Sequence, residues 1–167
     1  MKVWKIIFPV FALASAGLAG PTLACHEWIS TPGSAFAALE TLRDAAMYTA
    51  NHASEAGAAR ARIAVLRSEM RPDDPLTYLK AGYWITTLNS LGITQDADGP
   101  ALVQQAAEMR PSDPEYQFFA ALAWFDTDKA RYRTYWSRAQ HLAKPDTAVS
   151  RNLQNFEPVL RSREGSR

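Results

Sequence analysis

Apolar side chains recur every three or four positions along most of this chain, which is the spacing of helices that each bury one face. No segment shows the sustained alternation of apolar and polar residues that a half-buried strand requires. The pattern therefore predicts an all-α fold. The apolar stripes fall within residues 36–47, 63–70, 76–85, 100–109, 116–124, 132–142 and 149–156.

Four prolines divide the chain into units of similar length. Pro32, Pro72, Pro111 and Pro145 follow one another at spacings of 40, 39 and 34 residues. The stretches between them are rich in Ala, Leu, Arg, Glu and Gln, which favour helices. A period of this length points to stacked helical hairpins, in which each unit covers the apolar face of its neighbour.

The last predicted helix, residues 147–157, is more polar than the others and fits a cap over the end of the stack. Val149, Leu153 and Phe156 give it one apolar side. Pro158 is expected to end this helix, because proline offers no backbone N–H group. Residues 158–167 are then expected to form a solvated, disordered tail.

Nearly the same seven residues occur twice, as EMRPDDP at 69–75 and as EMRPSDP at 108–114. In the second copy Arg110 places a positive charge at the end of one predicted helix, and the proline after it stops that helix. Asp113 is predicted to cap the next helix, and Pro114 suits its first position. The repeated residues therefore indicate the boundaries of the units and not a duplicated site.

These features resemble tetratricopeptide repeats, whose unit of about 34 residues pairs two helices across a small residue and closes near a proline. In the second unit Gly82 falls at the small position and Tyr78 at the first aromatic position, with Ala106 at the later alanine. Ala121 takes the small position of the third unit. The resemblance implies a short right-handed superhelix of about three hairpins over residues 33–157, including the C-terminal capping helix.

The resemblance is most specific between residues 69 and 145. Gln117 stands at the first aromatic position of the third unit, and the alanine expected before Pro145 comes one residue early, as Ala139. The first two units are also longer than the usual repeat. The first hairpin is therefore the weakest match of the three.

In a tetratricopeptide array the first helix of each unit lines a concave groove, and such a groove binds an extended peptide or a helix of a partner. The resemblance places five residues closest to that face. Whether the aromatic ones line an open groove or belong to the core stays open at this point. The groove candidates are Leu79, Tyr83, Phe118, Leu122 and Phe125.

The first 24 residues have the order of a secretory signal peptide, with Lys2 and Lys5 first, then an apolar run, then small residues. A retained membrane anchor is the alternative, but prolines and glycines interrupt the run that a spanning helix of about 20 apolar residues needs. We therefore expect residues 1–24 to be removed on export, with residues 25–32 as a leader. The predicted location is the periplasm, free or in association with a membrane.

Cys25 is the only cysteine, so an internal disulfide is excluded. It follows Ala24 in the way that the lipid-bearing cysteine of a bacterial lipoprotein signal follows a small residue, although Thr22 stands where leucine is usual. Lipidation of Cys25 and ordinary cleavage beside it both fit the pattern. A lipid on Cys25, or a membrane-bound partner, would be the link between this chain and a membrane.

The charge balance argues against nucleic-acid binding. Cleavage after residue 24 would leave 16 basic and 17 acidic residues, which supply no excess positive charge for a phosphate backbone. The loop residues Asp96 and Asp98 resemble the start of a calcium site but lack the later ligands. His52 and His141 have no partner at the spacing of a helical metal site, and no nucleotide or haem motif occurs.

No catalytic residue, cofactor or metal ligand is therefore predicted. Cys25 and His26 are adjacent but lie at the mature terminus, where nothing would hold them in a catalytic geometry. The sequence favours a non-enzymatic, exported protein that binds another protein, as an assembly factor, an adaptor or a small accessory subunit of an envelope complex. The alternative is a small-molecule or lipid-binding helical module with an aromatic pocket. An enzyme would need a cluster of titratable groups, and no such cluster is evident.

Overall fold

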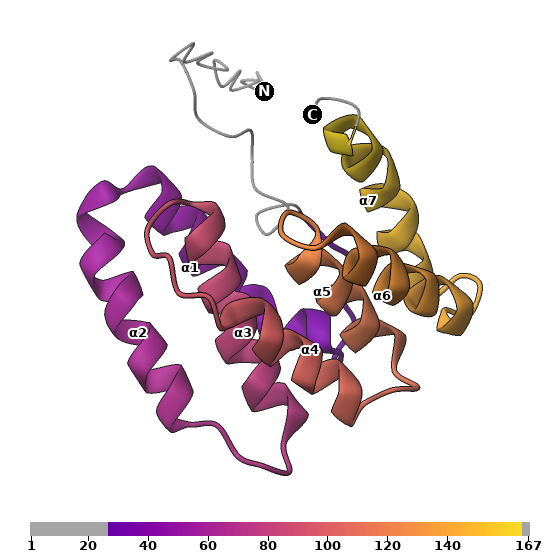
Figure 1. Cartoon of the computed structure of the whole chain (residues 1–167), viewed down its shortest axis with the longest axis horizontal. Coiled ribbons are helices and arrows are strands. Elements are labelled where there is room, and N and C mark those ends of the chain that lie inside the picture. The colour runs from indigo at the N-terminus through magenta and orange to yellow at the C-terminus, as the bar shows by residue number, and fades with distance from the viewer. Residues whose placement is uncertain (1–26, 165–167) are drawn as a thin grey trace, which may run out of the picture.

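A computed structural model describes residues 27–164, which contain seven α-helices, one short 3-10 helix and no strand (Figure 1). The predicted all-α fold is confirmed. The predicted signal peptide, Cys25 and residues 165–167 lie outside the described residues. The elements are α1 (Ala35–Asn51), η2 (Ala53–Glu55), α2 (Ala56–Ser68), α3 (Pro75–Ser90), α4 (Gly99–Met109), α5 (Pro114–Trp124), α6 (Lys129–Leu142) and α7 (Ala148–Glu164).

Both copies of the repeated seven residues mark helix boundaries, as predicted. The Asp74 side chain accepts a hydrogen bond of 3.1 Å from the Leu76 N–H at the start of α3. Asp113 accepts a bond of 3.0 Å from the Glu115 N–H at the start of α5. In each case a proline takes the first helical position. A cap of this kind contributes about 1 kcal/mol relative to alanine.

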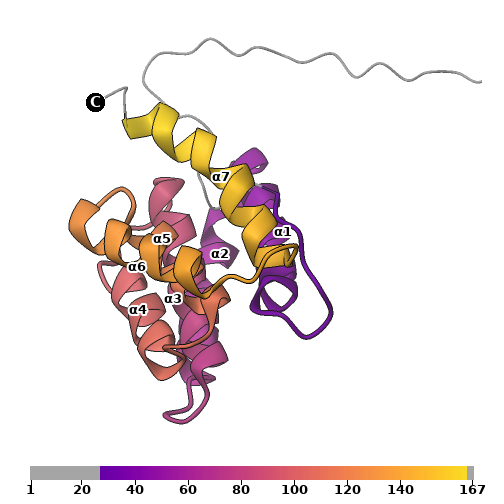
Figure 2. The same cartoon turned by 90° about the vertical axis from the view of Figure 1, so that its right-hand side faces the viewer.

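The helices form successive pairs around one hydrophobic core that extends from Trp28 to Leu160. The α3–α4 and α5–α6 pairs have the most extensive contacts, α5 also packs on α4, and α3 also packs on α1 and α2. α7 lies against α5 and α6 (Figure 2). The core is thus shared by all three pairs and by the last helix.

Two glycines bring α3 and α4 into close contact. A Cβ atom added to Gly82 would lie 2.7 Å from the carbonyl oxygen of Gly99 and 2.7 Å from Val103. A Cβ atom on Gly99 would lie 2.7 Å from the Thr86 hydroxyl oxygen. No side chain fits at either position without movement of the neighbouring helix, which is the physical reason for a small residue at position 82.

The first pair is packed differently, because α2 contacts α3 more extensively than it contacts α1. Only Ala59 and Leu66 are buried in α2. The Trp84 indole N–H donates a 3.0 Å hydrogen bond to the Ala59 carbonyl and so ties α2 to α3. α2 is therefore an edge helix (at the left in Figure 1) that covers one side of α3.

The prediction that Pro158 ends the last helix is wrong, because α7 continues through Pro158 to Glu164. Proline cannot donate to the carbonyl of Gln154, four residues earlier. Gln154 and Pro158 are both exposed, so water is available to that carbonyl group. In the next turn Leu160 is only 1% exposed. Burial of Leu160 offsets the missing hydrogen bond and keeps the predicted tail helical as far as residue 164.

Candidate functional site

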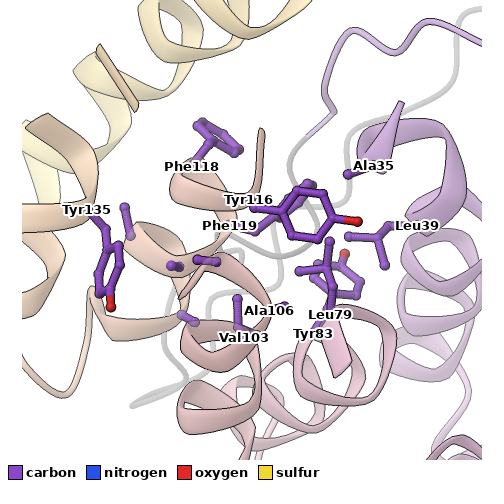
Figure 3. Close-up of a cluster of buried hydrophobic side chains, with 14 of the residues drawn as sticks. Ala35, Leu39, Leu79, Tyr83, Val103, Ala106, Tyr116, Phe118, Phe119 and Tyr135 are labelled. Atoms are coloured by element: carbon purple, nitrogen blue, oxygen red, sulfur yellow. The ribbon is translucent and has the colours of Figure 1, made fainter. Parts of the chain in front are cut away.

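The residues predicted to line a concave groove lie mostly in the core. Leu79, Tyr83, Phe118 and Phe125 are between 0% and 6% exposed, and Leu122 is half-buried. Figure 3 shows Leu79 and Tyr83 within the cluster of buried side chains between the helices. Phe125 packs edge-on against Tyr132 at a centroid distance of 5.0 Å, near the turn between α5 and α6. The structure therefore does not bring these five residues together as one open surface.

The side chain that fills the face between α1, α3 and α5 comes from the N-terminal end of the described chain. The Trp28 ring meets Phe119 at 5.5 Å and Tyr83 at 5.8 Å, both edge-on, and it meets Phe36 at 6.0 Å. Trp28 is 7% exposed. Aromatic pairs of this geometry contribute about 0.5–1.5 kcal/mol each beyond the area that they bury. Trp28, which the sequence analysis assigned to the leader, is part of the core.

Hydrogen bonds to α7 and α1 hold the residues that follow Trp28. The Ile29 N–H donates to the Asn152 side-chain oxygen at 2.7 Å, and the Asn152 amide donates back to the Ile29 carbonyl at 2.8 Å. Asn152 is fully buried. The Ser30 hydroxyl donates to the Glu40 carboxylate. We call residues 27–31 the N-terminal strap, because α1, α3, α5 and α7 hold it as they would hold an extended peptide.

A tight turn sets the direction of the strap. The Ser34 N–H donates to the Thr31 carbonyl at 3.0 Å, and Gly33 between them has a φ of 82°. Proline followed by a glycine with positive φ is typical of a type II turn. The Ser34 side chain then caps α1 by accepting a 3.1 Å hydrogen bond from Ala37. The turn therefore reverses the chain from the strap into α1.

The sequence analysis did not single out Asn152, and it gave Gln117 only as a departure from the repeat pattern. Asn152 lies three residues after Val149 and four before Phe156, so its place on the apolar stripe of α7 was the available signal. Gln117 is 1% exposed, and its side-chain amide donates to the carbonyls of Ala107 and Arg110 at 2.9 Å and 3.2 Å. The glutamine at this position therefore binds carbonyl groups at the end of α4.

An open cleft of about 1210 Å³ lies along the edge where several helices begin. It is bordered by the starts of α1, α5 and α7 and by the ends of α4 and α6. We call this feature the edge cleft. Its lining includes Ala37, Ala38, Leu76, Met109, Arg110, Pro111, Asp113, Glu115, Tyr116, Lys144, Asp146 and Val149.

Two carboxylates of the edge cleft, those of Asp113 and Glu115, accept hydrogen bonds from backbone N–H groups at helix starts. The Glu115 carboxylate accepts a 2.5 Å hydrogen bond from the Ala35 N–H at the first residue of α1, where the helix dipole favours negative charge. Burial raises the pKa of the Glu115 carboxyl above its ordinary value, although the bond from Ala35 lowers it. Burial also raises the pKa of Tyr116. The neighbouring hydroxyl of Thr147 donates to the Lys144 carbonyl at 2.8 Å.

The acidic and histidine side chains of the described residues form no metal-binding cluster. In residues 27–164 no three His, Cys, Asp or Glu side chains gather closely enough to bind a metal ion. Asp96 and Asp98 lie in the loop that resembles the start of a calcium site. Both form ion pairs with the Arg67 guanidinium, at 2.8 Å and 3.0 Å. His52 stacks on Tyr48 with ring centroids 4.0 Å apart.

None of the helices between residues 27 and 164 combines the length and the apolar character that crossing a membrane requires. Comparison of the chain with protein-family models, with curated proteins and with solved structures finds no match. A function for this chain is therefore inferred from its own residues and their geometry.

Proposed function

We propose that this chain is a non-enzymatic, exported helical-repeat protein that binds another protein, as an assembly factor, an adaptor or a small accessory subunit of a periplasmic or membrane-bound complex. We also propose that its helix pairs are tetratricopeptide-like hairpins stacked as a short right-handed superhelix. The close contact at Gly82 and the caps at Asp74 and Asp113 support the repeat interpretation, because they occupy the positions that such a unit requires.

The edge cleft is the observation that carries the proposal. It is large and open, and apolar residues such as Ala38, Leu76 and Val149 line it. Its polar side chains Asp113 and Glu115 are already bonded to the backbone at helix starts. What the cleft offers a ligand is therefore a large open volume with apolar residues in its lining, beside charged side chains such as Arg110 and Lys144.

The alternative, a lipid or small-molecule pocket among the aromatic residues, finds no support in the cavity beside them. Tyr83, Phe119 and Leu122 border a cavity of about 30 Å³. That volume is close to the share of one water molecule in the liquid, and it leaves no room for an acyl chain. Binding of a protein segment at the edge cleft is the better-supported reading.

Co-purification of a tagged full-length chain from solubilised membranes tests the proposal. Ala38→Arg would project a long charged side chain into the edge cleft, whereas Ala64→Arg makes the same change on the exposed side of α2. We expect the wild type and Ala64→Arg to recover the same partner, and Ala38→Arg to recover at least about tenfold less of it, which corresponds to about 1.4 kcal/mol. Recovery of the wild type only as a free monomer would contradict the proposal.

The export part of the proposal has its own test in the intact mass of the mature protein. We expect the chain to lack residues 1–24 and to begin at Cys25, with or without a lipid. A mature chain that still begins at Met1 would contradict export. An unmodified start at Gly17 or at Cys25 would exclude lipidation while leaving export intact.

A further inference from the structure

The near-neutral charge of the protein conceals a strong internal asymmetry. Residues 27–128 contain 7 basic and 14 acidic residues, whereas residues 129–164 contain 8 basic and 3 acidic residues. The second range comprises α6, α7 and the loop between them. A net charge of −7 in one part and +5 in the other creates a field that the overall balance does not reveal.

Two of the basic residues lie on one exposed flank of α6. The buried side of this helix carries Tyr132, Tyr135, Trp136 and Ala139. Arg131 and Arg138 are exposed and, being seven residues apart, they lie on the same flank about 10 Å from each other along the axis. We call this flank the arginine face; Thr134 lies between the two arginines, and Ala130 precedes Arg131.

Aromatic rings hold both guanidinium groups in place. Arg131 lies 4.4 Å from the centroid of the Trp124 ring, and Arg138 lies 5.3 Å from the centroid of the Tyr135 ring. A guanidinium stacked on a ring keeps its N–H edge free for hydrogen bonds in its own plane. Arg131 shares a 3.3 Å ion pair with Asp128, whereas Arg138 forms no ion pair with the described part of the chain.

A shallow hollow of about 210 Å³ runs beside these arginines, between α4 and α6. Its α4 wall is polar, because the Gln104 amide donates to the Glu108 carboxylate at 2.7 Å. The Tyr135 hydroxyl also donates to Glu108, at 3.4 Å. The hollow therefore has the two arginines on one side and the hydrogen-bonded Glu108 carboxylate on the other. The residues that line it are Gln104, Ala130, Arg131, Thr134, Tyr135 and Arg138.

We propose that the arginine face docks an acidic segment of a partner protein, with two carboxylates spaced about 10 Å apart, as at positions i and i+7 of a helix. The proposal rests on the proposed function, a protein-binding module, and names the chemistry of the partner. Carboxylates match the planar fork of arginine, which binds them through two parallel hydrogen bonds.

A protein segment fits this face better than a membrane does. Thr134 lies between the two arginines and Ala130 precedes them, and neither has a large apolar side chain to enter the acyl region of a bilayer. The carboxylates of Glu108 and Asp128 border the same flank and would repel a continuous sheet of anionic headgroups, whereas a segment with two localised charges avoids them.

The test uses a fluorescent 18-residue helical peptide with glutamate at two positions seven apart, and a second peptide with glutamine at both. Binding to the full mature chain is measured by fluorescence anisotropy at low and at moderate salt. The first variant is Arg131→Glu/Arg138→Glu, with Arg131→Gln/Arg138→Gln as a milder form in case the first does not fold. Arg60→Glu/Arg62→Glu on α2 is the matched control, because Arg62 also lies over a ring, that of Trp84, at 5.4 Å.

We expect the wild type and the α2 control to bind the glutamate peptide alike, and the arginine-face variants to bind it at least about tenfold more weakly. The wild type should bind the glutamine peptide at least about tenfold more weakly than the glutamate peptide, and moderate salt should weaken its complex with the glutamate peptide. A dissociation constant above about 1 mM for the wild type, or equal loss in the α2 control, overturns the proposal.

Three further outcomes also overturn it. In the first, the wild type fails to bind the peptide but sediments with vesicles that contain phosphatidylglycerol. If the arginine-face variants lose this sedimentation, the face is assigned to a membrane. A wild-type dimer in sedimentation velocity that the same variants abolish would assign it to a second copy of the chain. Co-purification lost in Ala38→Arg but kept in the arginine-face variants would leave the proposed function standing and overturn only this inference.

Discussion

The face between α1, α3 and α5 and the outer flank of α6 use aromatic residues in opposite ways. On the first face Trp28 of the N-terminal strap closes over Phe36, Tyr83 and Phe119, so the rings contact one another and exclude solvent. At the flank of α6 the rings of Trp124 and Tyr135 lie beside arginines that stay exposed. A high aromatic content therefore does not by itself locate a binding surface, because the residues that cover the rings decide whether the rings belong to the core or to the surface.

The largest effect is expected at the centre of the face between α1, α3 and α5. Phe36 is fully buried and contacts Trp28, Phe118 and Phe119. Phe36→Ala should lower the free energy of unfolding by about 3–5 kcal/mol, measured by chemical denaturation. Tyr48→Ala, on the same helix but 54% exposed, should change it by less than about 0.5 kcal/mol. Equal losses in the two variants would contradict a filled face between α1, α3 and α5.

The contact between α3 and α4 gives the next effect. Gly82→Ala places a Cβ atom 2.7 Å from the Gly99 carbonyl oxygen, and overpacking of this kind costs about 1–3 kcal/mol. Gly57→Ala, in α2 where no atom lies within 4 Å of the added Cβ, should instead stabilise by about 0.5–1 kcal/mol through helix propensity. Thermal unfolding of the pair should show opposite shifts. Two shifts of the same sign would show that the α3–α4 contact is looser than described.

Removal of the backbone clamp on the strap should have a comparable or smaller effect. Asn152→Ala leaves the Ile29 N–H and carbonyl without their partners, at a cost of about 1–3 kcal/mol. Asn155→Ala, an exposed change three residues further along α7, should be close to neutral. Identical denaturation midpoints for the two alanine variants would show that the strap contributes nothing to stability.

The smallest expected effect is a pH dependence at Glu115. Because burial raises the pKa of Glu115 in the folded protein above its ordinary value of 4.5, the folded state binds more protons than the unfolded state just above that pH. The contribution of Glu115 to stability is therefore full below pH 4.5 and falls as the pH rises through the folded pKa. Glutamine does not titrate, so Glu115→Gln should lack this pH dependence. The free energy of unfolding of the wild type minus that of the variant should therefore fall as the pH rises through this range. A wild type that gains stability relative to the variant over the same range would contradict the assignment.

Local signals predicted much of the fold. Helix spacing, the caps at Asp74 and Asp113 and the small residue at Gly82 depend on neighbours within one turn or on one facing helix, so the sequence carries them directly. The strap could not be predicted in this way, because Ile29 and Asn152 are 123 residues apart. Pro158 misled for a similar reason, since the burial of Leu160 in the next turn is a tertiary effect.

The candidate site was predictable only in part. The repeat register placed Leu79 and Tyr83 on the inward side of α3, and both are buried, but nothing in their spacing indicates that Trp28 covers that side. The edge cleft could not be predicted from the sequence, because the helix starts that border it are far apart along the chain. The arginine face also required the structure, since only the rings of Trp124 and Tyr135 distinguish Arg131 and Arg138 from ordinary surface arginines.

The exchange of the Ile29 backbone amide, followed by NMR, tests most directly whether the N-terminal strap fills the face between α1, α3 and α5. This N–H is bonded to the buried side chain of Asn152. We predict that it exchanges at least about 100-fold more slowly than an unstructured amide in the wild type, and that Asn152→Ala removes most of this protection. Exchange at the unstructured rate in the wild type would mean that the strap is not docked and that the face between α1, α3 and α5 is open to a partner.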